Sequence, residues 1–141
     1  MMIIPWDQLH GAMAQFPIAL LPCSVACEFG ALGFKRRPWA RELRTAGFYG
    51  LTLAAVASLG AAASGIALSG GEPWGRGDLL WHHRLAWPAF VLLAVWAVWR
   101  QLRREATPPT GWRLFLSLTA LSSGLVAVAA CCAEALLARA G

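Results

Sequence analysis

The chain has 141 residues, of which 58% are hydrophobic and only 13% are charged. That length usually holds one domain, but soluble domains carry about 25% charged residues. The composition therefore excludes a disordered chain, a coiled coil and an ordinary soluble enzyme, and it indicates helices that lie in a lipid bilayer. The formal net charge is +5, but the basic residues fall between apolar runs, so we expect no nucleic-acid partner.

Four apolar runs are each long enough to cross a bilayer, for which a helix needs about 20 residues. We expect the spans near 12–34, 45–69, 79–99 and 112–137. The segments that connect them are too short to fold as a soluble domain. The sequence thus predicts an all-α, integral membrane four-helix bundle, with 1–141 as a single domain.

Basic residues are distributed unequally between the two ends of the spans. Of the twelve, Arg76, Arg84 and Arg139 fall at one end, and the other nine lie between the first and second or the third and fourth spans. Basic loops stay in the cytoplasm. We therefore expect a multi-pass protein of the bacterial inner membrane with both termini in the periplasm. The acidic Asp7 and the lack of a basic cluster before it argue against a cleaved secretory signal.

Small residues form a stripe along the second span. They recur at three- and four-residue spacing, so they share one face of a helix. The members of this small-residue stripe are Gly47, Gly50, Ala54, Ala57, Ala61 and Ser64. Small side chains let helices approach closely where lipid gives no hydrophobic driving force. We expect close helix packing, and the alternative is room for a flat cofactor or for a helix of a partner subunit.

All three histidines lie at the outer ends of the spans, where His10 precedes the first span and His82 and His83 open the third. The first and third spans run in the same direction, so these imidazoles share a depth. Successive residues point about 100° apart on a helix, so at most one of His82 and His83 is expected to face His10. Two facing imidazoles suit a b-type haem, with Arg84 and Arg76 available to its propionates. The alternative is interfacial histidines that bond only water, loop carbonyls or each other.

Two polar residues lie inside the first span. Glu28 is about two turns from the cytoplasmic end, and an ionisable group there is costly and marks a functional hypothesis. It can pair with a basic residue of a cytoplasmic loop, bond a hydroxyl of another span or carry a proton. We expect Gln15 to bond across the bundle. The four cysteines form no CxxC motif, and we expect them to pack as small apolar residues.

The run LHGAMAQFPIALLP at 9–22 resembles the opening motif, of the form HPxxVHFPIALLP, of the small bacterial four-span proteins called domain of unknown function 2231. Such proteins also carry an acidic residue later in the first helix and a histidine at the start of the third. By this resemblance His10 matches the first motif histidine, Glu28 takes the acidic position, and His82 or His83 takes the position in the third helix.

Two positions depart from that motif, because Gly11 replaces its proline and Gln15 replaces its second histidine. The resemblance implies a redox association, since some members are joined to Rieske-type iron–sulfur domains or lie beside cytochromes. If the second motif histidine is the cofactor ligand in the family, Gln15 argues against haem here. If the first is the ligand, His10 retains the site.

These observations favour a redox-associated membrane subunit that binds one haem b near its outer face, with His10 and His82 or His83 as ligands and Arg84 beside a propionate. It would pass electrons between quinol or other membrane subunits and a periplasmic cytochrome. We expect no catalytic activity of its own, because the sequence offers no nucleophile–base pair and no phosphate-binding loop. The alternatives are a cofactor-free subunit that scaffolds a larger complex through the small-residue stripe, and a small transporter that uses Glu28 and Gln15.

The unequal distribution of basic residues predicts the topology directly. Alkaline phosphatase fused after Gly141 should be active, as expected for a periplasmic site, whereas the same reporter inserted in 35–44 should be inactive. A fluorescent protein that folds only in the cytoplasm should give the reverse pattern. A cytoplasmic C-terminus would contradict either the number of spans or their orientation.

Overall fold

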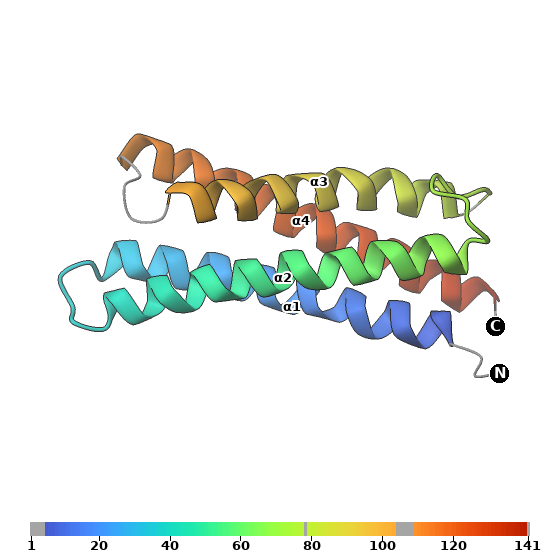
Figure 1. The fold of residues 1–141 in the computed structure, drawn as a ribbon, viewed down its shortest axis with the longest axis horizontal. Helices are drawn as coiled ribbons and strands as arrows, with labels where there is room; N and C mark the ends of the chain where they lie inside the picture. The colour runs from blue at the N-terminus through green and yellow to red at the C-terminus, as the bar shows by residue number, and fades with distance from the viewer. Residues whose placement is uncertain (1–4, 78, 104–108, 141) are drawn as a thin grey trace.

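The computed structural model describes residues 5–77, 79–103 and 109–140, which form four helices and, within those ranges, no β-strand (Figure 1). The helices are α1 (Trp6–Gly33), α2 (Ala40–Leu68), α3 (Leu79–Arg103) and α4 (Pro109–Ala140). Each contains a stretch long and apolar enough to cross a membrane. The prediction of an all-α membrane bundle is confirmed, and α1 and α2 begin several residues earlier than expected because their polar first turns are also helical.

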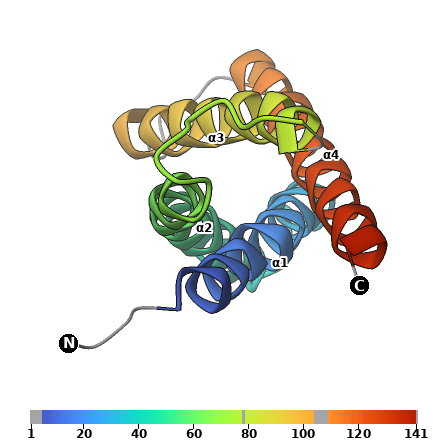
Figure 2. The same cartoon turned by 90° about the vertical axis from the view of Figure 1, so that its right-hand side faces the viewer.

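The helices form a square in which α1 and α3 each pack against both α2 and α4 (Figure 2). Two pairs, α1 with α3 and α2 with α4, therefore face each other across the diagonals. The start of α1, the loop between α2 and α3 and the end of α4 lie at one end, which we call the outer end (Figure 1). The turn between α1 and α2 lies at the opposite end, which we call the basic end.

Helices α1 and α2 approach each other closely along the small-residue stripe. A Cβ atom added at Gly47 would lie 2.9 Å from Cγ of Glu28, and one added at Gly50 would lie 3.4 Å from Cβ of Ser24. The Ser24 hydroxyl donates a 2.6 Å hydrogen bond to the carbonyl of Gly47, so the contact is polar as well as close. The expected packing role of the stripe is confirmed, and its partner is α1 of the same chain.

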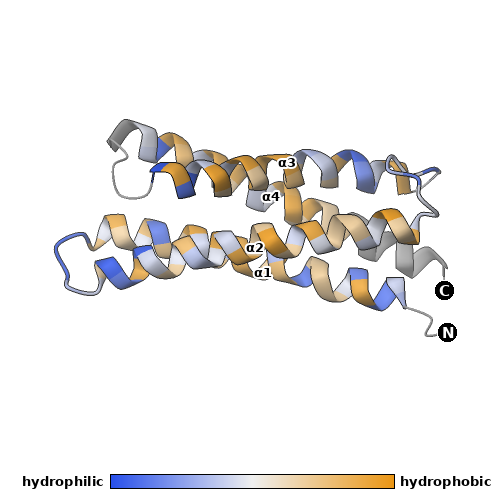
Figure 3. Cartoon of the chain, viewed as in Figure 1, coloured by the Kyte–Doolittle hydropathy of each residue, from blue (hydrophilic) through white to orange (hydrophobic). Residues whose placement is uncertain are grey.

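The interior changes in character along the bundle. The large buried side chains lie from the middle toward the basic end, and they are Leu21, Leu51, Leu93, Phe115, Leu116 and Trp112. From the middle outward the buried residues are small, and they are Ala54, Ser58, Ser64, Ala89, Ser122 and Ala129. Many large apolar side chains of the helices are exposed, as expected for a surface that contacts lipid. Hydrophobic residues predominate in the middle of the helices, whereas the turn between α1 and α2 is hydrophilic (Figure 3).

Adding one methyl group at Gly47 tests the close approach of α1 and α2. Gly47→Ala should lower the free energy of unfolding by about 1–3 kcal/mol, because the new Cβ overlaps Glu28 and the backbone of Ser24. Gly11→Ala is the matched control, since nothing lies within 4 Å of a Cβ at that position, and it should be neutral or stabilising. Equilibrium unfolding in mixed micelles measures both. Equal effects of the two substitutions would contradict the packing described.

Candidate functional site

His10 of α1 and His82 of α3 meet across a diagonal of the bundle at the outer end. Their ring centroids are 6.4 Å apart and their planes are nearly perpendicular, at 83°. His10 lies on the face of α1 that also carries Pro17, Leu21, Ser24 and Glu28, all of them buried, so the packing of α1 on α2 turns its ring inward. The structure thus selects His82, and not His83, as the histidine that faces His10.

Both rings are oriented by backbone carbonyls of the other two helices. Nδ1 of His10 donates a 2.9 Å hydrogen bond to Ala61 of α2, and Nδ1 of His82 donates a 3.1 Å bond to Ala129 of α4. A carbonyl oxygen only accepts, so the hydrogen of each neutral ring resides on Nδ1 and Nε2 keeps a lone pair. This is the arrangement by which proteins orient histidines that ligate a metal.

Small residues at the outer end of α2 also make room for His10. A Cβ added at Gly65 would lie 3.0 Å from Cε1 of the His10 ring. The Oγ atom of Ser64 lies 3.3 Å from Nδ1 of the same ring. The position of the His10 ring therefore depends on glycine and serine at the outer end of α2.

His83 and Arg84 face the loop and the surface rather than the bundle interior. Nδ1 of His83 donates to the carbonyl of Pro73 at 3.0 Å, which ties the start of α3 to the preceding loop. Arg84 is exposed, and its guanidinium lies 5.0 Å from the ring of Trp81. Close to them, Arg76 pairs with Glu72. In this arrangement neither arginine contacts His10 or His82 through an ion pair or ring contact.

The prediction that Gln15 bonds across the bundle is wrong, because its side chain is exposed. Gln15 follows His10 by five residues, which turns it about 140° around the helix from the inward face. Glu28 lies on that inward face. The two polar residues assigned to a transporter therefore do not face a common space.

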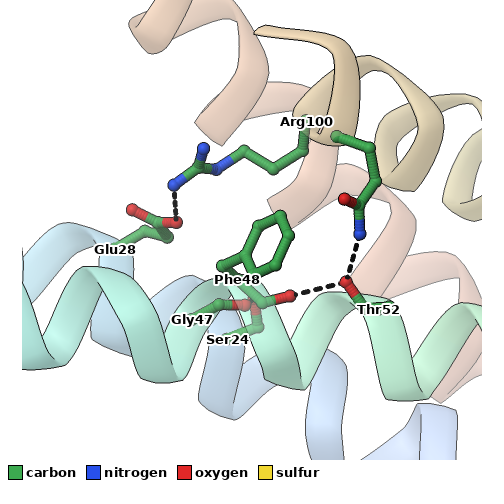
Figure 4. Close-up of polar contacts among 7 residues, drawn as sticks. Ser24, Glu28, Gly47, Phe48, Thr52 and Arg100 are labelled. Atoms are coloured by element: carbon green, nitrogen blue, oxygen red, sulfur yellow. Dashed lines mark hydrogen bonds and ion pairs between the residues drawn. The ribbon is translucent and has the colours of Figure 1, made fainter. Parts of the chain in front are cut away.

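Glu28 and Arg100 form a buried ion pair across the same diagonal, near the basic end (Figure 4). Glu28 is 2% exposed and Arg100 is 4% exposed, and Nη2 donates to Oε1 at 3.4 Å. The pairing of Glu28 with a basic residue is confirmed. Its partner was expected in a cytoplasmic loop, but Arg100 lies within α3. The spacing of Ala89, Leu93, Ala97 and Arg100 on one buried face is the signal that could have identified it.

Aromatic rings surround this pair. The Arg100 guanidinium lies 4.9 Å from the ring centroid of Trp112 and 5.4 Å from that of Phe48, and Arg44 lies 5.5 Å from the Trp112 ring. Such cation–π contacts stabilise guanidinium groups that have left water. Oε2 of Glu28 is enclosed without a hydrogen-bond partner among the described residues. The Glu28 carboxylate is therefore buried with a described partner at one of its two oxygens.

The cysteines give no sign of a metal site. Among the described residues no group of three or more His, Cys, Asp and Glu side chains is placed to hold a metal ion. Cys23 and Cys131 are exposed and Cys27 is half-buried, all as free thiols. The expectation of interior packing is wrong for Cys23 and Cys131, because they lie on helix faces that point away from the bundle.

The fold and these contacts define an integral membrane four-helix bundle with polar contacts across one diagonal. The family model described as "Predicted membrane protein (DUF2231)" matches residues 7–141, and the chain belongs to this family. The resemblance inferred from 9–22 is thereby confirmed. A search of curated proteins gave no match, and neither did a search of solved structures.

Removing one partner of the buried ion pair should destabilise the bundle. Glu28→Ala should lower the free energy of unfolding by about 3–5 kcal/mol, because the Arg100 charge then stays buried without its carboxylate. Glu42→Ala is the control, since Glu42 is exposed and its loss should change stability little. Thermal unfolding in detergent compares the two variants. If Glu28→Ala unfolded at the same temperature as the control, the pair would not stabilise the fold.

Proposed function

We propose that this protein is a redox-associated membrane subunit that holds one b-type haem between His10 and His82 at its outer end. The observation that carries the proposal is the orientation of both imidazoles by Nδ1–H bonds to backbone carbonyls. Those bonds leave Nε2 of each ring as the donor atom to iron. His10 matches the first motif histidine of the family, so the site proposed here does not use the position of the second, which Gln15 occupies.

The separation of the two rings suits a shared metal ion. A ligating imidazole nitrogen lies about 2 Å from its metal, and the ring centroid lies about 1 Å further away, so one shared ion separates two centroids by roughly 6 Å. The observed centroid distance is 6.4 Å. Because α1 and α3 are diagonal partners, such an ion would lie near the axis of the bundle, where four-helix proteins hold cofactors.

The buried residues of the outer half, such as Ala54, Ser58 and Ala89, have small side chains, whereas aromatic rings fill the basic end. Arg84 lies at the outer surface and is a candidate partner for a propionate carboxylate. His83 holds the start of α3 to the loop and is assigned a positioning role.

When bound, haem b would supply reversible one-electron chemistry. The residues of this chain would hold the iron, fix the imidazole orientation and exclude water with the surrounding helices. A site at the outer end suits exchange of electrons between quinol or other subunits in the inner membrane and a periplasmic cytochrome. With both termini periplasmic, that end would face the periplasm.

The two alternative functions have weaker support. A scaffold that uses the small-residue stripe would need that surface for a partner, but α1 covers it within the chain. A transporter that uses Glu28 and Gln15 would need them on one face, but Gln15 is exposed and Glu28 is buried against α3.

Absorption spectra of the purified protein test the haem proposal. The wild type, expressed in a host that makes haem, should show a sharp Soret band that shifts on reduction with dithionite. His10→Ala and His82→Ala should each abolish the six-coordinate spectrum, because one imidazole ligand is lost. His83→Ala should retain it, and Gln15→Ala is the matched control on the exposed face of α1.

Two outcomes would contradict this proposal. A haem spectrum unchanged by both His10→Ala and His82→Ala would remove these residues from the site. A wild type that purifies without haem and does not bind added haemin would refute a haem subunit altogether. Circular dichroism of each variant distinguishes loss of a ligand from loss of the fold.

A further inference from the structure

The turn between α1 and α2 gathers exposed positive charge. Lys35, Arg36, Arg37 and Arg41 are all exposed within seven residues. None of these four side chains forms an ion pair with a residue in the described ranges. The acidic residue nearest to this stretch in sequence is Glu42, which is exposed directly after Arg41 and also lacks an ion pair with a described residue.

Two cations that the structure describes at the outer end, Arg76 and Arg84, are arranged differently. Arg76 pairs with Glu72, and Arg84 lies over the ring of Trp81. Their charges are thus directed to groups of the protein itself, whereas those of the α1–α2 turn are directed outward. The exposed cations of the α1–α2 turn therefore differ from Arg76 and Arg84 in having no partner of this kind among the described residues.

The turn also forms a small hollow, and two aromatic rings pack beside it. Gly33, Phe34, Lys35, Arg36 and Arg37 line a small hollow. Beside it the Phe34 and Trp39 rings pack with centroids 4.9 Å apart, and they remain 52% and 42% exposed. Aromatic rings of this kind lie at the level of lipid headgroups. The hydrophilic turn follows directly on the apolar body of the two helices (Figure 3).

We propose that this hollow binds the headgroup phosphate of an anionic phospholipid. Guanidinium groups match a phosphate through paired hydrogen bonds, and clustered cations beside a membrane span attract anionic headgroups. A lipid fits better than a soluble phosphate, because the exposed ring of Phe29 lies about one turn before the hollow on α1 and can contact the acyl chains. This site lies at the opposite end of the bundle from the histidines and does not depend on a cofactor.

Native mass spectrometry of the full chain tests this proposal. The protein is released from micelles that contain equal amounts of phosphatidylglycerol and phosphatidylcholine. The wild type should retain phosphatidylglycerol at least fivefold over phosphatidylcholine. The triple variant Lys35→Gln, Arg36→Gln, Arg37→Gln should lose this preference. Arg113→Gln is the control, because it removes an exposed cation of α4 that lies outside the hollow, and it should keep the preference.

A second experiment distinguishes binding of the lipid from binding of free phosphate. Inorganic phosphate at millimolar concentration should not displace phosphatidylglycerol from the wild type, because it lacks acyl chains. Equal retention of the two lipids by the wild type would overturn the proposal, as would an unchanged preference in the triple variant. Full displacement by inorganic phosphate would assign the hollow to a soluble anion and would overturn the lipid assignment. Circular dichroism confirms that the triple variant is folded.

Discussion

A bilayer offers no water to the polar groups within it, so polar groups that lie between spans are stabilised by partners on neighbouring helices. The contacts in this bundle follow from that constraint. Ser24 of α1 donates to a carbonyl of α2, His10 donates to another carbonyl of α2, and Glu28 pairs with Arg100 of α3. Each of these contacts joins two different helices. They therefore fix the rotation and the vertical register of helices that hydrophobic packing alone would leave undetermined.

The two contacts between α1 and α3 lie at opposite ends of the bundle. His10 and Glu28 are separated by eighteen residues of α1, which corresponds to about 27 Å along a helix. Between them the interior contains the leucines Leu21, Leu51 and Leu93 together with small hydroxyl side chains such as that of Ser58. Both contacts depend on glycines of α2, because Gly47 beside Glu28 and Gly65 beside His10 let α1 approach α2 and so place its polar side chains over the centre of the bundle.

Periodic features of the sequence predicted much of this arrangement. Hydropathy located the four spans, and the spacing of the small residues identified the packing face of α2. The positions of the histidines in two parallel spans predicted that His10 lies at the same depth as the histidines of α3. The predictions that failed depend on how each helix is rotated about its own axis, and only tertiary packing determines that rotation. Gln15 proved to be exposed, and Arg100 proved to be a buried residue of α3 although it had been counted with a loop. Its long side chain reaches inward to Glu28, and a count of loop charges does not reveal this.

The central claim is that His10 and His82 present their Nε2 atoms to one shared iron. Pulsed electron paramagnetic resonance of the oxidised protein, prepared with isotope-labelled histidine, tests it most directly. The account predicts a low-spin iron coupled to the nitrogens of two histidines, with one coupling lost in each single alanine variant. An iron signal coupled to fewer than two histidines in the wild type would contradict the account, and so would the absence of any iron signal.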